Sequence, residues 1–244
     1  MTAFTVSIAD VPVRVESIYP AAEPFCRDYI TEKEPLFTVS VTPEDIERER
    51  SLSAAEDERE GRSVRSFSEP YLETLAIYRK LAEKMLRYNA LVFHGSALAA
   101  GGAAYLFTAP SGTGKTTHTR LWLEQYPDCH VLNGDKPMLR FAEERVLVCG
   151  TPWQGKERLG CNEILPLAAI CLLERGVENS IEPLSFRDAL PVLIRQTHCP
   201  EGQDALLNII SLLGRLNGSV GLFRLRCNMR PEAARVCRQG LMGG

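Results

Sequence analysis

A run of small and hydroxylated residues that ends in a lysine and two threonines is the part of the chain best suited to chemistry. It reads Ala109-Pro110-Ser111-Gly112-Thr113-Gly114-Lys115-Thr116-Thr117. It follows an apolar, strand-like stretch at 103–108 and opens a stretch with helical character at 114–126. A strand, a glycine-rich turn and a helix is the context in which backbone N–H groups and the positive end of a helix dipole bind phosphate oxygens. The run therefore predicts a phosphate-binding loop (P-loop).

Each residue type in this predicted loop has its own task. Lys115 is expected to bring a positive charge to the β- and γ-phosphates, and the Thr116 hydroxyl is expected to ligate Mg²⁺. Ala109 stands at the first position of the pattern G-x-x-x-x-G-K-[ST], where alanine can serve if φ stays negative. The competing interpretation is an ordinary turn that caps a helix.

Two further residues stand where predicted strands end. Asp135 follows the strand predicted at 129–132, and His94 closes the strand that precedes a Gly-Gly turn. A carboxylate beside a P-loop can hold Mg²⁺ or accept a proton from an attacking hydroxyl, and a histidine can contact phosphate. Read alone, they are a turn aspartate and a structural histidine, so both assignments depend on the loop.

A third unusual stretch is rich in glycine and proline. It reads Gly150-Thr151-Pro152-Trp153-Gln154-Gly155-Lys156. Such a loop can close over phosphate with Lys156 as a second positive charge, or it can be a turn anchored by a buried Trp153. The residues favour neither interpretation over the other.

Composition excludes several classes of protein. The 244 residues carry a net charge of −3 without a basic stripe, which does not suggest nucleic-acid binding. Neither a membrane-length apolar run nor a signal pattern is present, so we expect a cytoplasmic protein without a membrane partner. The eight cysteines form no C-x-x-C pair, and most lie in apolar stretches. We expect buried free thiols, and the spacing alone does not favour a zinc site.

Periodicity divides the chain into a small N-terminal α+β lobe, 1–88, and a P-loop domain, 89–244. The lobe is expected to hold a hairpin at 2–17, a short helix within 19–30, a strand at 36–41, a helix start at Thr42-Pro43 with a charged helix or loop to 62, and an amphipathic helix at 68–89. The second part is expected to hold strands at 91–93 and 103–108 around a 99–102 turn, a strand at 129–132, a hairpin at 137–149, a buried strand at 164–173, helices at 186–197 and 202–216, a strand at 220–227 and a helix at 231–239. Hairpins interleaved with helices predict an α/β fold with a mixed sheet around the P-loop.

These motifs together resemble a known family. His-Gly before a strand, then a P-loop, then a strand ending in aspartate resembles the catalytic domain of HPr kinase/phosphorylase and the wider group with the phosphoenolpyruvate carboxykinase fold. The stretches 133–137 and 150–156 look most like smaller HPr-kinase-related proteins. The resemblance is good over 94–175 and extends to 235 in outline, whereas the N-terminal lobe does not look like that of full-length HPr kinase.

The resemblance implies an assignment of roles. It implies that ATP phosphates and Mg²⁺ are bound by Ser111, Gly112, Thr113, Gly114, Lys115, Thr116 and Thr117, and that Asp135 and His94 lie at the transferred phosphate. With the residue-based assignments, Thr116 and Asp135 are the expected metal ligands, and Asp135, His94, Lys115 and Lys156 form the expected catalytic set. The family has two adjacent acids where this chain has Gly134 and Asp135. Asp135 is then expected both to hold Mg²⁺ and to accept the proton of the acceptor hydroxyl, with Glu157 as the candidate second carboxylate. Gly134→Asp is expected to leave activity intact or raise it, provided that residue 134 does not need a positive φ.

The expected function is that of an ATP- and Mg²⁺-dependent kinase acting on a serine of a protein or peptide, the acceptor being implied by the resemblance only. Two alternatives stay open: a kinase for a small hydroxyl metabolite and a non-catalytic nucleotide-binding module. The resemblance also hints at a homo-oligomer. The signatures of phosphorolysis and of decarboxylation are not recognisable, so neither reaction is expected.

Overall fold

The computed structural model describes residues 2–59 and 61–242. The chain divides into two compact units, with the division between Lys84 and Met85. Within the described residues, no helix combines the length and the apolar character that a membrane span requires.

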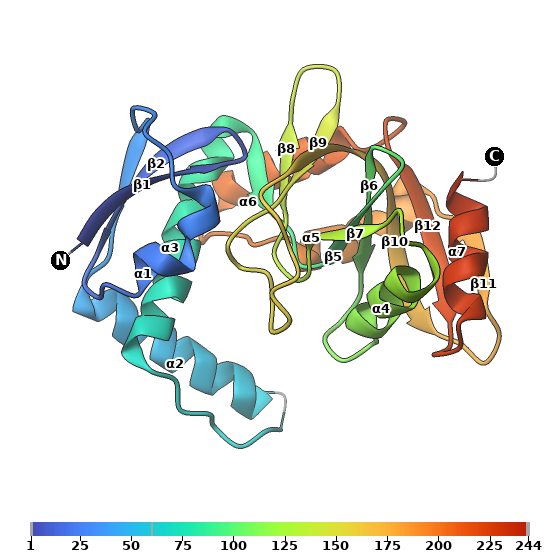
Figure 1. Ribbon diagram of the computed structural model, residues 1–244, viewed down its shortest axis with the longest axis horizontal. Coiled ribbons are helices and arrows are strands. Elements are labelled where there is room, and N and C mark those ends of the chain that lie inside the picture. Colours follow the sequence, from blue (N-terminus) through green and yellow to red (C-terminus); the bar gives the residue numbers. More distant parts are fainter. Residues whose placement is uncertain (1, 60, 243–244) are drawn as a thin grey trace. The chain divides into compact units, whose positions relative to one another are not determined.

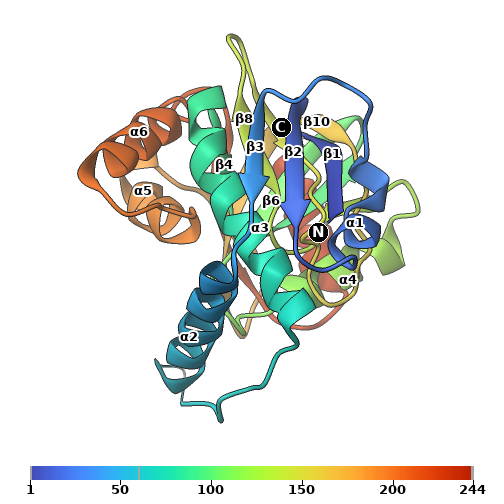
Figure 2. The same ribbon diagram turned by 90° about the vertical axis from the view of Figure 1, so that its left-hand side faces the viewer.

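The first unit is built on a three-stranded sheet (Figure 2). Strands β1 (Thr2–Ile8) and β2 (Val11–Ser17) form the expected hairpin, which turns at Ala9 and Asp10 with φ of 52° and 57°. Strand β3 (Phe37–Ser40) runs parallel to β2. The short helix expected within 19–30 is one helical turn, α1 (Ala22–Phe25), followed by a 3-10 turn, Arg27–Tyr29.

Two longer helices complete this unit. Helix α2 (Pro43–Arg59) starts where expected: the Thr42 hydroxyl accepts from the Asp45 N–H at 3.4 Å, and the Asp45 carboxylate accepts from the Thr42 N–H at 2.8 Å. Helix α3 (Glu69–Met85) is shorter than the stretch expected at 68–89, and a 3-10 turn (Leu86–Tyr88) follows it. The Arg79 guanidinium of α3 pairs with the nearly buried Glu49 of α2, which joins the two helices.

The second unit holds a mixed sheet, as the sequence predicts. Strands follow one another in the order β4 (Ala90–Val92), β8 (Met138–Phe141), β9 (Val146–Cys149), β10 (Ile164–Arg175), β6 (Ala103–Thr108), β5 (Ser96–Ala100) and β7 (His130–Asn133), and β12 (Gly221–Cys227) and β11 (Ser180–Pro183) extend from β10. The long strand β10 is antiparallel to β9 but parallel to β6 and β12.

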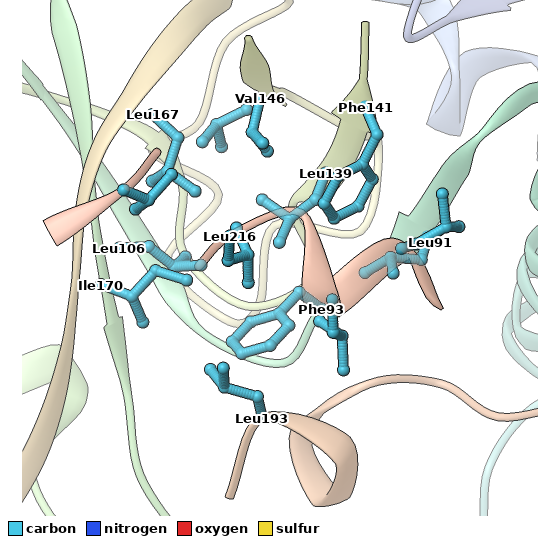
Figure 3. Close-up of a cluster of buried hydrophobic side chains, with 14 of the residues drawn as sticks. Leu91, Phe93, Leu106, Leu139, Phe141, Val146, Leu167, Ile170, Leu193 and Leu216 are labelled. Atoms are coloured by element: carbon cyan, nitrogen blue, oxygen red, sulfur yellow. The ribbon is translucent and has the colours of Figure 1, made fainter. Parts of the chain in front are cut away.

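Helices cover both faces of this sheet. Helices α5 (Phe186–Gln196) and α6 (Gln203–Gly214) pack into one apolar cluster, in which Phe93, Leu106, Ile170 and Leu193 meet (Figure 3). Helices α4 (Lys115–Gln125) and α7 (Glu232–Met242) lie beside each other (Figure 1) and pack into a second cluster around Trp122. Because α4 is held by this cluster, the loop that precedes it has a fixed base.

One expectation about the strands was wrong, and two strands were missed. The strand after the 3-10 turn, β4, pairs with β8 and not with β6; the partner of β6 is β5, which the sequence analysis left unassigned. Strand β11 was also unassigned, because four residues at the sheet edge with one partly buried side chain give little periodicity. All eight cysteines are free thiols as expected, and five of them are buried.

Helix α4 contains a buried histidine, His118, that predicts an acid-sensitive fold. Its Nε2 accepts from the Trp122 indole N–H at 3.1 Å, and Nδ1 has no hydrogen-bond partner among the described residues. Burial lowers the pKa of His118 to about 4 from an ordinary 6.5. The unfolded chain therefore binds an extra proton between these values, so the stabilising contribution is complete above pH 6.5 and is lost as the pH falls towards 4.

We expect His118→Gln to remove much of this pH dependence, because the glutamine oxygen can still accept from Trp122 and does not titrate. Between pH 7 and pH 4 the wild-type free energy of unfolding should fall by about 3 kcal/mol more than that of the variant. Urea unfolding of wild type and variant at both pH values measures the difference. Equal pH dependence of wild type and His118→Gln would contradict the expectation.

Candidate active site

A cavity of about 530 Å³ lies in the second unit where β6 passes into α4. Its lining brings together residues from four separate parts of the sequence. Of the residues singled out in the sequence, it contains His94, Ser111, Gly112, Gly114, Lys115, Thr116, Thr117, Asp135, Lys156 and Glu157. Thr113 does not line it: its hydroxyl donates to the Pro110 carbonyl at 2.9 Å.

The loop at 109–114 has the backbone that a phosphate cradle requires. Gly112 and Gly114 have φ of 76° and 124°, and a Cβ on either would meet no other atom within 4 Å. Helix α4 begins without a side-chain cap, so its first N–H groups remain available to a ligand. The Arg175 guanidinium, from the end of β10, donates to the Gly112 carbonyl at 2.6 Å. This bond satisfies the Gly112 carbonyl oxygen and links the loop to the end of β10.

Lys115 is only partly accessible in the empty loop. Its side chain is half-buried, and Nζ donates to the Ala109 carbonyl at 2.8 Å. Burial, with a smaller contribution from the charge of Lys136, lowers the pKa of Lys115, and Asp135 opposes that shift. A ligand phosphate would replace the Ala109 carbonyl as the partner of this ammonium group.

Asp135 is positioned by a neighbouring amide. The buried Asn133 side chain donates to the Thr151 carbonyl at 3.1 Å and accepts from the N–H groups of Asp135 and Lys136 at 2.9 and 2.8 Å. The Asp135 carbonyl accepts from the Gly95 N–H at 3.0 Å. These bonds hold the Asn-Gly-Asp turn and bring it against the His94-Gly95 segment.

His94 and Asp135 therefore face each other. His94 Nε2 lies 3.5 Å from Asp135 Oδ1, and the Thr108 hydroxyl donates to the His94 carbonyl at 2.9 Å. Burial and the charges of Lys136 and Lys115 lower the pKa of His94 to about 4, against the opposing effect of Asp135. At neutral pH the His94 imidazole is therefore uncharged.

Sequence reasoning did not select Lys136, although it follows Asp135 directly. Its Nζ lies 3.9 Å from Asp135 Oδ2, on the other carboxylate oxygen from His94. The signal that could have found it is the Asn-Gly-Asp-Lys run itself, because a lysine next to a candidate catalytic acid contributes charge to the same place.

The stretch at 150–156, called the Gly-Pro-Trp loop below, combines both interpretations that the sequence left open. Trp153 and Gln154 are buried and anchor it, while Lys156 and Glu157 line the cavity. The Glu157 carboxylate pairs with the Arg120 guanidinium of α4. The expected second carboxylate is therefore already engaged in an ion pair.

The structure explains the glycine at 134 and shows that Gly134→Asp would require a backbone shift. The φ of Gly134 is not positive, but a Cβ there would lie 2.6 Å from the Gln154 carbonyl oxygen. The space that a side chain at 134 would need is filled by the backbone of the Gly-Pro-Trp loop. An added side chain must displace that backbone.

We accordingly expect Gly134→Ala to lower the free energy of unfolding by about 1–3 kcal/mol, the usual cost of overpacking. Gly214→Ala is the control, since a Cβ on that helical glycine meets nothing within 4 Å. Urea denaturation compares the two variants. If Gly134→Ala is as stable as Gly214→Ala, the Gln154 backbone does not constrain this position.

Comparison with known proteins adds little to these observations. No protein-family model matches the chain, and no curated protein is similar to it in sequence. Among solved structures, the Hpr(Ser) kinase/phosphatase from Coxiella burnetii shares a distant likeness: 10% sequence identity and a TM-score of 0.34, over 61% of this chain and 95% of that chain. A likeness this weak carries no functional weight, so the cavity residues must carry the assignment.

Proposed function

We propose that the protein is an ATP- and Mg²⁺-dependent kinase that transfers the γ-phosphoryl group to a hydroxyl. The observation that carries the proposal is the composition of one cavity. A glycine loop, an uncapped helix N-terminus and Lys115 form one part of its lining, and the Asp135–His94 pair forms another. Groups that can donate hydrogen bonds to phosphate and a candidate general base thus face the same ligand.

The residues present fit a magnesium nucleotide. The loop offers N–H donors without a competing side-chain cap, and Thr116 is exposed with a hydroxyl that can ligate Mg²⁺. Asp135 is about one-third exposed, so one carboxylate oxygen can reach a ligand while the other stays near Lys136. When bound, Mg·ATP supplies the phosphoryl group, and the cation offsets charge on its oxygens.

The chain's own residues then have distinct tasks. Lys115 exchanges the Ala109 carbonyl for phosphate oxygens and stabilises their charge during transfer. Asp135 accepts the proton of the acceptor hydroxyl at a carboxylate oxygen. The other candidate carboxylate, Glu157, is already paired with Arg120. The neutral His94 and the cationic Lys136 hold the carboxylate in place, and Lys156 contributes a further positive charge from the loop wall.

We assign the acceptor as a serine hydroxyl of a protein or peptide, on the sequence resemblance alone. One rival function is a nucleotide-binding module without transfer. Two observations favour it: Glu157 is paired with Arg120, and residue 134 is a glycine and so offers no second acid.

Labelled phosphoryl transfer separates these functions. The protein is incubated with Mg²⁺ and ATP labelled at the γ-phosphate, with serine-containing peptides in one set of reactions and hydroxyl metabolites in another. Label on a peptide serine supports the proposal, and label only on a metabolite moves the acceptor to the small-molecule class. ATP binding without transfer or hydrolysis would replace the kinase with the binding module, and no ATP binding would overturn both.

A further inference from the structure

Three side chains with metal-binding atoms lie together at the base of the Gly-Pro-Trp loop, and none of them lines the cavity. They are His130, the first residue of β7, and Cys161 and Glu163, just before β10. His130 Nε2 lies 2.6 Å from Glu163 Oε2, and Cys161 Sγ lies 3.7 Å from the same oxygen. All three potential ligand atoms lie within 4.8 Å of one another.

Backbone hydrogen bonds set these positions without any help from the side chains. The Cys161 N–H donates to the Leu132 carbonyl of β7 at 3.1 Å, which places Cys161 beside the strand that carries His130. The Gly150 N–H donates to the Glu163 carbonyl at 2.9 Å, which closes the 150–163 loop at its base. Two strands and a closed loop thus hold the three residues together, and a cation would find them preorganised.

The chemistry of the set is specific. A thiolate, an imidazole and a carboxylate are the ligands that Zn²⁺ takes in proteins, at about 2.0–2.3 Å, whereas Mg²⁺ and Ca²⁺ prefer oxygen alone. Tetrahedral ligand atoms at those bond lengths are roughly 3.3–3.8 Å apart. The Cys161–Glu163 separation already lies in this range, and the His130–Glu163 contact opens by less than about 1 Å when a cation replaces the shared proton.

We propose that His130, Cys161 and Glu163 form a binding site for Zn²⁺ or a similar transition-metal cation, with a fourth position open to water. Cys161 binds the cation as a thiolate, so binding releases the proton of the thiol. Because Cys161 and Glu163 end the loop that carries Gln154 and Lys156, the cation fastens that loop to β7. The site does not depend on the proposed kinase function.

Cobalt titration of the full, reduced chain tests the site, because Co²⁺ bound to a thiolate gives a sulfur-to-metal charge-transfer absorption that a structural cysteine does not. We expect about one equivalent of Co²⁺ to produce this band and Zn²⁺ to displace it. Cys161→Ser should abolish the band. Cys199→Ser, which changes an exposed cysteine outside the cluster, should keep it.

Zinc affinity gives an independent measurement, by competition with a chromophoric chelator. His130→Gln and Glu163→Gln should each weaken Zn²⁺ binding by at least about tenfold, since even outer-shell partners of a metal change affinity by 10–100-fold. His130 is exposed, so this variant tests the site even if Cys161→Ser fails to fold. A band that survives in Cys161→Ser, or Zn²⁺ affinity unchanged in His130→Gln and Glu163→Gln, would overturn the proposal.

Discussion

Asp135→Asn is expected to lower phosphoryl transfer by about 10²–10⁴-fold, the usual contribution of a general base. The substitution keeps the size of the side chain but removes its charge and basicity. It should also weaken Mg²⁺-dependent nucleotide binding, because a carboxylate ligand is replaced by a neutral amide. The turn itself should survive, since Asn133 and Gly95 bind only the backbone of residue 135.

Initial rates of transfer, or of slow ATP hydrolysis, with Mg²⁺ titrated measure this effect. Asp204→Asn is the matched control: it changes an exposed aspartate in the first turn of α6, outside the cavity, and should leave the rate unchanged. Near-normal turnover by a folded Asp135→Asn protein would mean that the catalytic carboxylate lies elsewhere.

Lys115→Ala is expected to weaken ATP binding by about 10–100-fold, because a hydrogen bond to a charged group contributes about 1.5–3 kcal/mol. Transfer should fall as well, since the ammonium group stabilises charge on the moving phosphoryl group. The variant also leaves the Ala109 carbonyl without the Lys115 donor, so a loss of stability of about 1 kcal/mol is expected alongside.

Isothermal titration calorimetry with ATP in the presence of Mg²⁺ measures the ATP affinity. Urea unfolding at the same pH measures the free energy of unfolding. Lys33→Ala, which truncates an exposed lysine of the first unit, is the control for charge removal. If folded Lys115→Ala binds ATP like wild type, the loop at 109–117 is not the phosphate site.

Local patterns in the sequence determined much of the fold. The alternation at 2–17 predicted the β1–β2 hairpin, Thr42-Pro43 predicted the start of α2, and the apolar run at 164–173 predicted β10. The P-loop pattern likewise predicted a turn between β6 and α4. For the hairpin, the helix start and the turn, the interactions that decide the structure join residues close in the chain, so residue type and spacing are sufficient. For β10 the apolar run identifies a buried strand but not its partners.

Strand pairing was decided only by the tertiary structure. Nothing near β4 in the chain shows that it pairs with β8, whose Arg140 lies opposite Ala90 and fifty residues (140 − 90) further along the chain. That choice depends on which apolar faces meet in the core. The unassigned β5 shows the same limit: its small residues, mostly alanine, give no alternation when both faces of the strand are buried.

The site shows the same division between local and long-range information. The sequence selected Lys115, Asp135 and His94 by type and spacing, whereas the Gly95–Asp135 hydrogen bond that brings two of them together joins segments forty residues apart (95 and 135). The reason for Gly134 and the meeting of His130 with Cys161 were likewise invisible in the sequence. Each depends on the position of the Gly-Pro-Trp loop, which lies against β7 and against the Asn-Gly-Asp turn after β7. Packing of backbone against backbone is set by the folded sheet, so it leaves no pattern among neighbouring residues in the sequence.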